Sequence, residues 1–268
     1  MKILLIGDIV GRPGRAVIER EVVALRQERA IDLVVANCEN AAGGAGITPR
    51  IADDLFRTGV DVLTSGNHVW KKREAFDLLK LDPRVIRPAN YPDGAPGSGS
   101  AVVETLSGQK VGVLNVMGRV FMEPLECPFR AAERELARLK LVTPVIIVDM
   151  HAEATSEKVA MGWFLDGKVS CVFGTHTHIP TADERILPQG TAFITDVGMT
   201  GPYDSVIGRR VDQILERFLS NIPNRSEVAE GNIQLRGLLV EVNPTTGKAT
   251  AVERITRTLD GLVRDSRD

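Results

Sequence analysis

Short runs of apolar, mostly β-branched residues alternate with helical patterns along this chain of 268 residues. A run over residues 3–6 leads into a turn rich in Gly and Pro. Apolar residues at helical spacing over 16–29 come next, followed by a second run over 33–36. Apolar runs of this length predict strands, and the spacing between them predicts an amphipathic helix. The chain therefore opens as a strand, a helix and a strand.

The same alternation continues toward the C-terminus, where strand patterns become more frequent. The pattern predicts helices at 49–57, 72–80, 131–140 and 211–220, and strands at 60–64, 101–106, 111–116, 145–148, 169–173, 191–195, 235–242 and 250–255. No low-complexity linker and no repeat of fixed period interrupts it. We therefore expect a mixed α/β architecture with at least two sheets, formed as one continuous domain over residues 1–268.

The composition excludes several classes of partner. Lys and Arg number 33 against 35 Asp and Glu, and only 4% of residues are aromatic. A nearly neutral chain with few stacking side chains is not expected to bind extended nucleic acid. No apolar stretch exceeds four residues, whereas a membrane span needs about 20, and the first residues run straight into a predicted strand. We expect a cytoplasmic protein with no membrane partner.

The length of the chain and the placement of its cysteines indicate what a bound metal would do and whether disulfides form. A chain this long buries roughly three-quarters of its unfolded surface, so a bound metal would serve chemistry rather than stability. The three cysteines are odd in number, lie far apart and form no C-x-x-C pair (Cys38, Cys127 and Cys171). We expect reduced thiols.

Polar clusters follow five of the predicted strands. All four histidines of the chain fall in three of these clusters, and the other two hold an aspartate and a Glu-Asn pair. Open α/β sheets place their ligands at the carboxyl ends of the strands. An isolated histidine is more commonly a surface or core residue, but four together favour a site. The candidate residues are Asp8, Glu39, Asn40, Asn67, His68, His151, His176 and His178.

The donor types in these clusters indicate metal binding. If residues 176–178 are extended, the rings of His176 and His178 share one face, an arrangement that commonly binds a metal. Imidazole, carboxylate and carboxamide donors without thiolate suit Mn, Fe or Zn. Two carboxylates, three imidazoles and two amides suffice for two ions. Two ions about 3.5–4 Å apart with a bridging hydroxide suit in-line attack on phosphorus.

The order of these clusters resembles the calcineurin-like metallophosphoesterases, and the YmdB branch in particular. The elements that carry the resemblance are Gly7-Asp8, Glu39-Asn40, Gly66-Asn67-His68, His151 and the GTHTH of residues 174–178. Segments 7–11, 40–42, 87–90, 151–158 and 196–203 are similar to the YmdB branch. The resemblance implies a sandwich of two mixed β-sheets flanked by α-helices.

The resemblance also implies a role for each candidate residue. One ion would be held by Asp8 and His178, and the other by Asn67, His151 and His176. Glu39 takes the bridging position, where the family usually has an aspartate.

Val10 stands where the family has a further histidine ligand, and Asn40 is the replacement that we expect. His68 corresponds to the acid that protonates the leaving oxygen. The implied cofactors are two divalent or mixed-valence transition metal ions, Fe or Mn first and Zn as an alternative.

The resulting prediction is a dinuclear phosphodiesterase that hydrolyses small phosphodiesters, 2′,3′-cyclic nucleotides above all. A metal-bridging hydroxide would attack phosphorus and His68 would act as general acid. Two alternatives stay open: a phosphomonoesterase with the same site, and a metal-binding regulatory protein without turnover. A homo-oligomer is compatible with the sequence.

Three further features are left with two interpretations each. Arg12 and Arg15 are candidates for phosphate contact or ordinary exposed arginines at a helix start. The small-residue loops 41–46 and 198–202 could approach a ligand or form plain turns. For Asp149, an ordinary acid at a strand end is the favoured interpretation over a hydrogen-bond acceptor behind His151. The glycines of residues 7–14 match neither a dinucleotide nor a P-loop motif.

Overall fold

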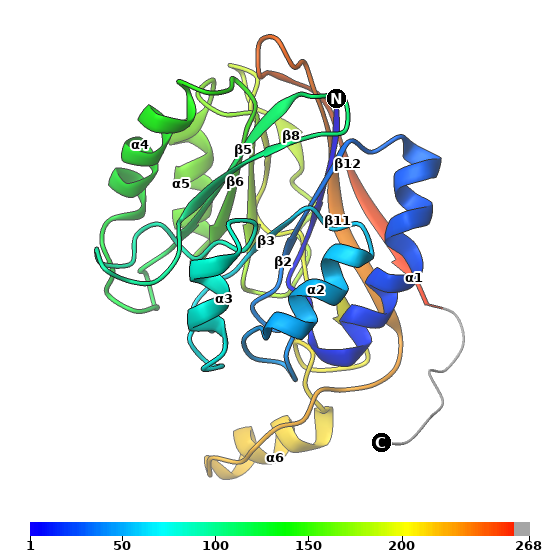
Figure 1. Cartoon of the computed structure of the whole chain (residues 1–268). Helices are drawn as coiled ribbons and strands as arrows, with labels where there is room; N and C mark the ends of the chain where they lie inside the picture. The colour runs from blue at the N-terminus through cyan, green and yellow to red at the C-terminus, as the bar shows by residue number, and fades with distance from the viewer. Residues whose placement is uncertain (260–268) are drawn as a thin grey trace.

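A computed structural model of the chain describes residues 1–259, which form two six-stranded mixed sheets and six helices (Figure 1). The first sheet has the order β10-β11-β1-β2-β3, with β12 also paired to β11. Strands β1, β2 and β3 are parallel to one another, and β11 runs antiparallel to β1. These strands are β1 (Lys2–Ile6), β2 (Leu33–Asn37), β3 (Val62–Thr64), β10 (Gly201–Pro202), β11 (Ile233–Val242) and β12 (Ala249–Thr258).

The second sheet has the order β4-β5-β6-β7-β9-β8. Its four central strands are parallel, and the two edge strands are antiparallel to their neighbours. These strands are β4 (Ser100–Glu104), β5 (Lys110–Met117), β6 (Ile146–His151), β7 (Cys171–Thr175), β8 (Arg185–Ile186) and β9 (Ala192–Ile194). The expected α/β fold with two mixed sheets is thus confirmed.

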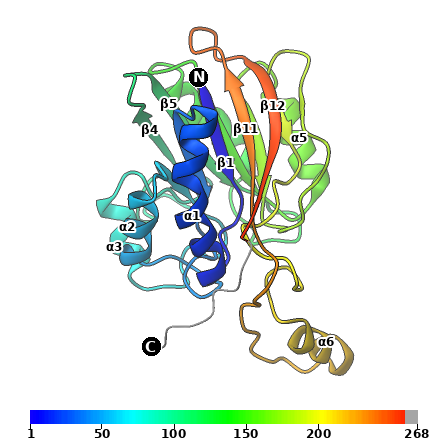
Figure 2. The same cartoon turned by 90° about the vertical axis from the view of Figure 1, so that its right-hand side faces the viewer.

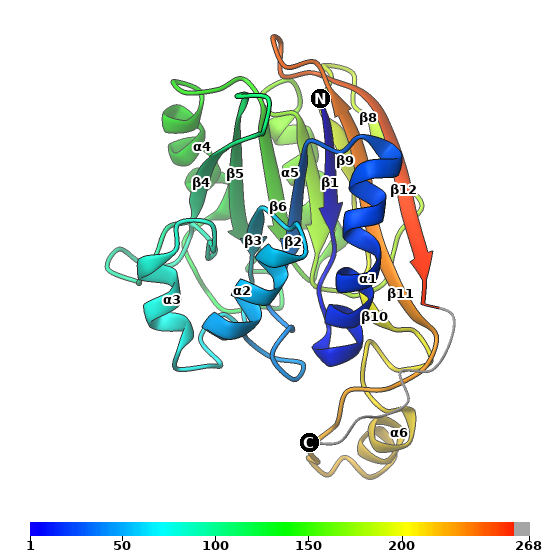
Figure 3. The ribbon, with the colours of Figure 1, turned by 45° about the vertical axis from the view of Figure 1, so that its right-hand side comes forward.

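The two sheets pack face to face and helices cover both outer faces, so the molecule has four layers (Figures 1 and 3). Buried side chains between the sheets include Leu5 and Val35 from the first sheet and Ile147 and Phe173 from the second. The covering helices are α1 (Gly11–Arg29), α2 (Pro49–Arg57) and α3 (Ala75–Leu81) on one side and α4 (Pro128–Leu139) and α5 (Thr155–Leu165) on the other. Alternate residues of each strand therefore face different layers.

Helix α6 (Val211–Ser220) lies apart from the sheets, at the end of the molecule toward which β1 runs (Figures 2 and 3). This is also the end at which the candidate residues gather. No helix among residues 1–259 combines the length and the apolar character that crossing a bilayer requires.

The sequence-based prediction missed three elements: α5, β8 and β10. Helix α5 escapes the amphipathic pattern because Glu157 and Lys158 are buried in it together with Met161. Strands β8 and β10 have two residues each, too few to show a period. Strand β6 also extends past its predicted end at residue 148, so that His151 is the last residue of the strand.

Candidate metal centre

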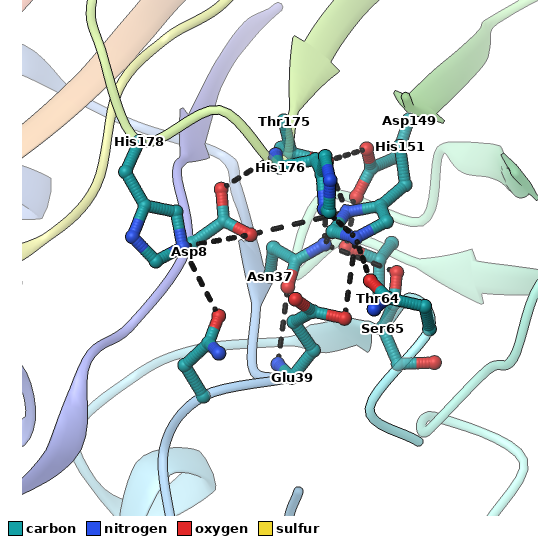
Figure 4. A network of polar contacts seen from close by, with 12 residues as sticks. Asp8, Asn37, Glu39, Thr64, Ser65, Asp149, His151, Thr175, His176 and His178 are labelled. Atoms are coloured by element: carbon teal, nitrogen blue, oxygen red, sulfur yellow. Dashed lines mark hydrogen bonds and ion pairs between the residues drawn. The ribbon is translucent and has the colours of Figure 1, made fainter. Parts of the chain in front are cut away.

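The structure brings all eight candidate residues together at the carboxyl ends of five strands from both sheets. Figure 4 labels Asp8, Glu39, His151, His176 and His178 among them. Each predicted cluster lies at the end of β1, β2, β3, β6 or β7, the same edge that the sequence indicated. Gly66 shows how closely the chains approach here. A Cβ atom on Gly66 would collide with the His151 ring and with the Glu39 carboxylate. Only glycine therefore fits at position 66 without moving these side chains.

Four side chains form a first group around Nε2 of His151. This nitrogen lies 3.2 Å from Glu39 Oε2, 3.1 Å from Asn67 Oδ1 and 3.1 Å from His176 Nδ1. Glu39, His151 and His176 each offer a ligand atom within 4.8 Å of the others. The spacing fits donors that share one ion.

A second group forms around Nε2 of His178. It lies 3.3 Å from Asn40 Oδ1 and 3.9 Å from Asp8 Oδ1. The same Asp8 oxygen is 3.8 Å from His151 Nδ1, so Asp8 stands between the two groups (Figure 4). The two groups contain the residues that the resemblance assigned to two separate ions.

Residues 176–178 are not extended, so the arrangement in which both histidine rings share one face does not form. Strand β7 ends at Thr175, and both His176 and His178 have a positive φ, 95° and 66°. The N–H and the hydroxyl of Thr177 donate to Asp196 Oδ2 at 3.2 and 2.8 Å, which holds the segment in a turn. The two rings consequently serve different groups instead of sharing one face.

In His151 and His178, the contact made by Nδ1 sets the orientation of the ring. Thr175 Oγ1 donates its one hydrogen to Asp149 at 2.6 Å and lies 2.9 Å from His151 Nδ1, so it must accept from that nitrogen. His178 Nδ1 lies 2.9 Å from the Ile207 carbonyl, which only accepts. In both rings Nε2 is therefore the nitrogen that faces the other candidate donors, the orientation that metal-binding histidines adopt.

In His176 the two ring nitrogens exchange places: Nε2 points away from the other candidate donors and Nδ1 faces them. Its Nε2 lies 3.1 Å from a carboxylate oxygen of Glu153, an acceptor, and its Nδ1 faces His151. The inference from the sequence did not include Glu153, Thr175 or the Ile207 carbonyl. Glu153 and Thr175 stand within two residues of candidate histidines. No pattern distinguishes them from neighbouring polar residues.

Asp149 has a different role from the one that the sequence favoured. It is fully buried and accepts hydrogen bonds from Thr175, from the Thr64 hydroxyl and from the Asn37 amide, the last at 3.0 Å. Burial raises the pKa of Asp149 to about 6. Asp149 thus anchors the threonine that orients His151, and is not an ordinary acid at a strand end.

A side-chain amide oxygen faces a histidine nitrogen at two points of the site. The Asn40 amide nitrogen donates to the Gly44 carbonyl at 3.2 Å, so its oxygen is the atom that faces the lone pair of His178 Nε2. Asn67 Oδ1 faces His151 Nε2 in the same way. Two lone pairs at these distances repel each other unless a cation or a proton lies between them.

The buried charges point to the same conclusion. Asp8 and Glu39 are both buried, and Asp8 Oδ1 has no hydrogen-bond partner. Burial raises the pKa of Asp8. Burial would also raise the pKa of Glu39, but the His151 and His68 rings hold it well below its usual range. A buried carboxylate oxygen without a partner is costly unless a cation meets it, so these residues fit metal ions.

The histidine charges depend on the same carboxylates. Burial opposes protonation of His151, yet Glu39 and Asp8 raise the pKa of its ring to about 9. Burial lowers the pKa of His176 to about 3, with His151 adding to the effect. Without metal, one proton on His151 is therefore the positive charge that balances Glu39. Bound cations would take over that role.

His68 and Val10 lie at the edge of the second group. The half-buried His68 ring places Nδ1 3.0 Å from the Asn40 amide nitrogen and 3.4 Å from Glu39 Oε1. Val10 is buried and its side chain has no ligand atom; its backbone N–H donates to the Thr200 carbonyl. Arg15 donates to the Ala41 carbonyl and so stabilises the small-residue loop over 41–46.

Known proteins similar to this chain carry related descriptions. A model of the YmdB-like protein family matches residues 4–255. A Bacillus subtilis protein named 2′,3′-cyclic-nucleotide 2′-phosphodiesterase is 48% identical over 255 residues, covering 95% of this chain and 96% of that protein. A Mycoplasma pneumoniae protein named as a putative phosphatase/phosphodiesterase is 36% identical over 95% of this chain and 92% of its own.

Two solved structures share the whole fold. A hypothetical protein from Thermus thermophilus superposes with a TM-score of 0.90 at 41% identity, covering 96% of this chain and 99% of that one. A structure described as a novel phosphatase from Mycoplasma pneumoniae superposes with a TM-score of 0.89 at 34% identity, covering 96% and 93%.

Proposed function

The chain belongs to the YmdB-like family, and on this premise we propose that it is a metal-dependent phosphodiesterase that hydrolyses small phosphodiesters, 2′,3′-cyclic nucleotides above all. One observation carries the proposal: three histidines each turn one ring nitrogen toward two buried carboxylates, one of which has an oxygen without a hydrogen-bond partner. The name of the Bacillus subtilis relative supports the substrate class.

Two sets of residues would hold two ions. Asp8, Asn40 and His178 form one set. Asn67, His151 and His176 form the other. Glu39 contacts His151 and would bridge the two sets. Two bound divalent ions would lower the pKa of the attacking water and neutralise charge on the phosphoryl oxygens.

His68 supplies the proton for the leaving oxygen in this proposal. Nδ1 of His68 lies 3.0 Å from the Asn40 amide nitrogen and 3.4 Å from Glu39 Oε1, so this nitrogen faces the candidate ligands. The other ring nitrogen, Nε2, makes neither of these contacts. A proton held there, on a half-exposed ring beside the metal site, can be given to a departing alkoxide.

Substituting His68 separates this role from metal binding. We expect His68→Ala to keep both metals while kcat for a 2′,3′-cyclic nucleotide falls by roughly 10²–10⁴-fold. Activity on bis-p-nitrophenyl phosphate should fall much less, because p-nitrophenolate leaves without a proton. Equal losses on both substrates, or loss of metal, would remove His68 from the chemistry.

Metal content and a substrate panel test the proposal as a whole. Protein reconstituted separately with Mn, Fe, Zn and Mg should bind two ions per chain and hydrolyse cyclic nucleotides faster than phosphate monoesters. Turnover of monoesters alone would indicate a phosphomonoesterase. No turnover with any metal would support a regulatory protein. A reproducible single ion per chain would refute the dinuclear arrangement.

A further inference from the structure

An aromatic ring stands exposed at the edge of the metal centre. Phe121 lies on the loop between β5 and α4, is 90% exposed and has a φ of 61°. A bulky residue rarely adopts the left-handed conformation, and such outliers gather at functional sites. Folding gains little from a ring that stays in water, so packing does not account for Phe121.

The loop that carries Phe121 is tied to the body of the protein. The N–H of Gly118 donates to the His151 carbonyl at 2.9 Å. The N–H groups of Arg119 and Val120 donate to the buried carboxylate of Glu157 in α5, at 3.2 and 3.3 Å. The fold therefore sets the place of Phe121 from two directions, through β6 and through α5.

A pocket of about 390 Å³ opens between this loop and the metal centre. Its lining comprises two residues of the metal centre, Asn67 and His176, and three loop residues, Phe121, Met122 and Glu123. Those residues include no lysine or arginine, and the Glu123 carboxylate would repel a phosphate. An aromatic ring and a thioether favour a flat, uncharged group. The volume is within the range of ordinary small-molecule sites.

We propose that this pocket binds the base of the nucleotide and that Phe121 stacks against it. This inference rests on the proposed function, because it takes the substrate to be a 2′,3′-cyclic nucleotide. In such a molecule the base and the cyclic phosphate are attached to neighbouring carbons of one ribose. The base must therefore lie beside the phosphate site, and the pocket shares Asn67 and His176 with that site.

The test compares a substrate that has a base with one that lacks it. Removing a stacking ring weakens binding by roughly 5- to 150-fold per base. We expect Phe121→Ala to raise KM for 2′,3′-cyclic AMP by that factor and to leave KM for methyl riboside 2′,3′-cyclic phosphate unchanged. Phe121→Trp should retain the wild-type KM. Leu106→Ala, which removes a fully exposed side chain from the β4–β5 turn, is the control for a surface truncation.

A binding measurement keeps this inference separate from catalysis. In calorimetric titrations Phe121→Ala should weaken binding of adenosine 3′-monophosphate but not of ribose 3-phosphate. Unchanged constants for the nucleotides, or equal losses with and without the base, would overturn the base pocket. Failure of wild-type protein to hydrolyse either cyclic ester would overturn the proposed function instead, while the calorimetric comparison would still decide the fate of the pocket.

Discussion

Replacing Lys158 by methionine is expected to loosen the segment that carries two of the candidate metal ligands. Lys158 lies fully buried in α5, and its Nζ donates to Asp196 Oδ2 at 2.6 Å and to the Thr175 carbonyl at 2.7 Å. The same Asp196 oxygen accepts from Thr177. One buried ion pair therefore holds both ends of the turn from which His176 projects.

The size of the effect follows from burial. Methionine keeps an unbranched apolar stem of similar length but leaves the Asp196 carboxylate buried without its cation. Breaking a buried pair in this way costs about 3–5 kcal/mol, a large share of the roughly 5–15 kcal/mol that stabilises a typical domain. With an unfolding entropy of about 2.1 cal/mol/K per residue, Tm should fall by about 5–9 °C.

Thermal unfolding followed by circular dichroism measures this change, with metal content after dialysis as a second readout. Lys140→Met removes an exposed lysine and should change stability by less than about 0.5 kcal/mol. The double variant Lys158→Met with Asp196→Asn should be more stable than the sum of the single losses predicts. A Tm within about 1 °C of wild type for Lys158→Met, or strictly additive effects, would refute the reasoning.

Three further predictions concern the bridging carboxylate, a buried aspartate and the cysteines. Glu39→Gln should release both ions and abolish activity, whereas Asn40→Ala should release one; two ions retained in Glu39→Gln after dialysis would contradict the bridging role. Burial would raise the pKa of Asp183, but two threonine hydroxyls that donate to it hold the pKa below its usual value. This carboxylate therefore stabilises the fold above pH about 4, the pKa range of an unfolded Asp, and the contribution is lost as the pH falls through the lower folded pKa. The Tm deficit of Asp183→Asn should accordingly be present at pH 7 and shrink in acid, and a constant deficit would count against it. Cys127 is half-buried while burial raises the pKa of the other two thiols, so Ellman's reagent should label one cysteine per native chain, and rapid labelling of all three would be inconsistent with the structure.

The alternation of strands and helices was readable from the chain because it depends on local periodicity. Helices α2 and α6 begin and end at the predicted residues, and the strands are displaced by a few residues at most. Besides the two-residue strands β8 and β10, the prediction missed α5, where Lys158 and Glu157 face inward. A lysine and a glutamate normally indicate a solvent face, so only their distant partners, Asp196 and the backbone of the loop at 119–120, explain their burial.

The candidate residues of the site were likewise readable, because they are polar residues that follow apolar runs at a sheet edge. The structure gathers these residues in two groups, one around His151 and one around His178. The orientation of the side chains of residues 176–178 could not be predicted from the sequence. Alternation applies only inside a strand, and β7 ends one residue earlier.

The chain itself thus carries the types of donor and their order along the strands, since both depend on residues next to one another. Which nitrogen of each ring faces inward depends on groups far away in sequence. Thr175 reaches His151 because β6 and β7 pair in a register that places them opposite each other, and His178 is oriented by a carbonyl 29 residues later. Phe121 reaches the site for the same reason, because its loop is tied to Glu157 in another layer of the fold. A hydrogen bond needs its donor and acceptor within about 3 Å of each other, and only the packed sheets bring these segments that close.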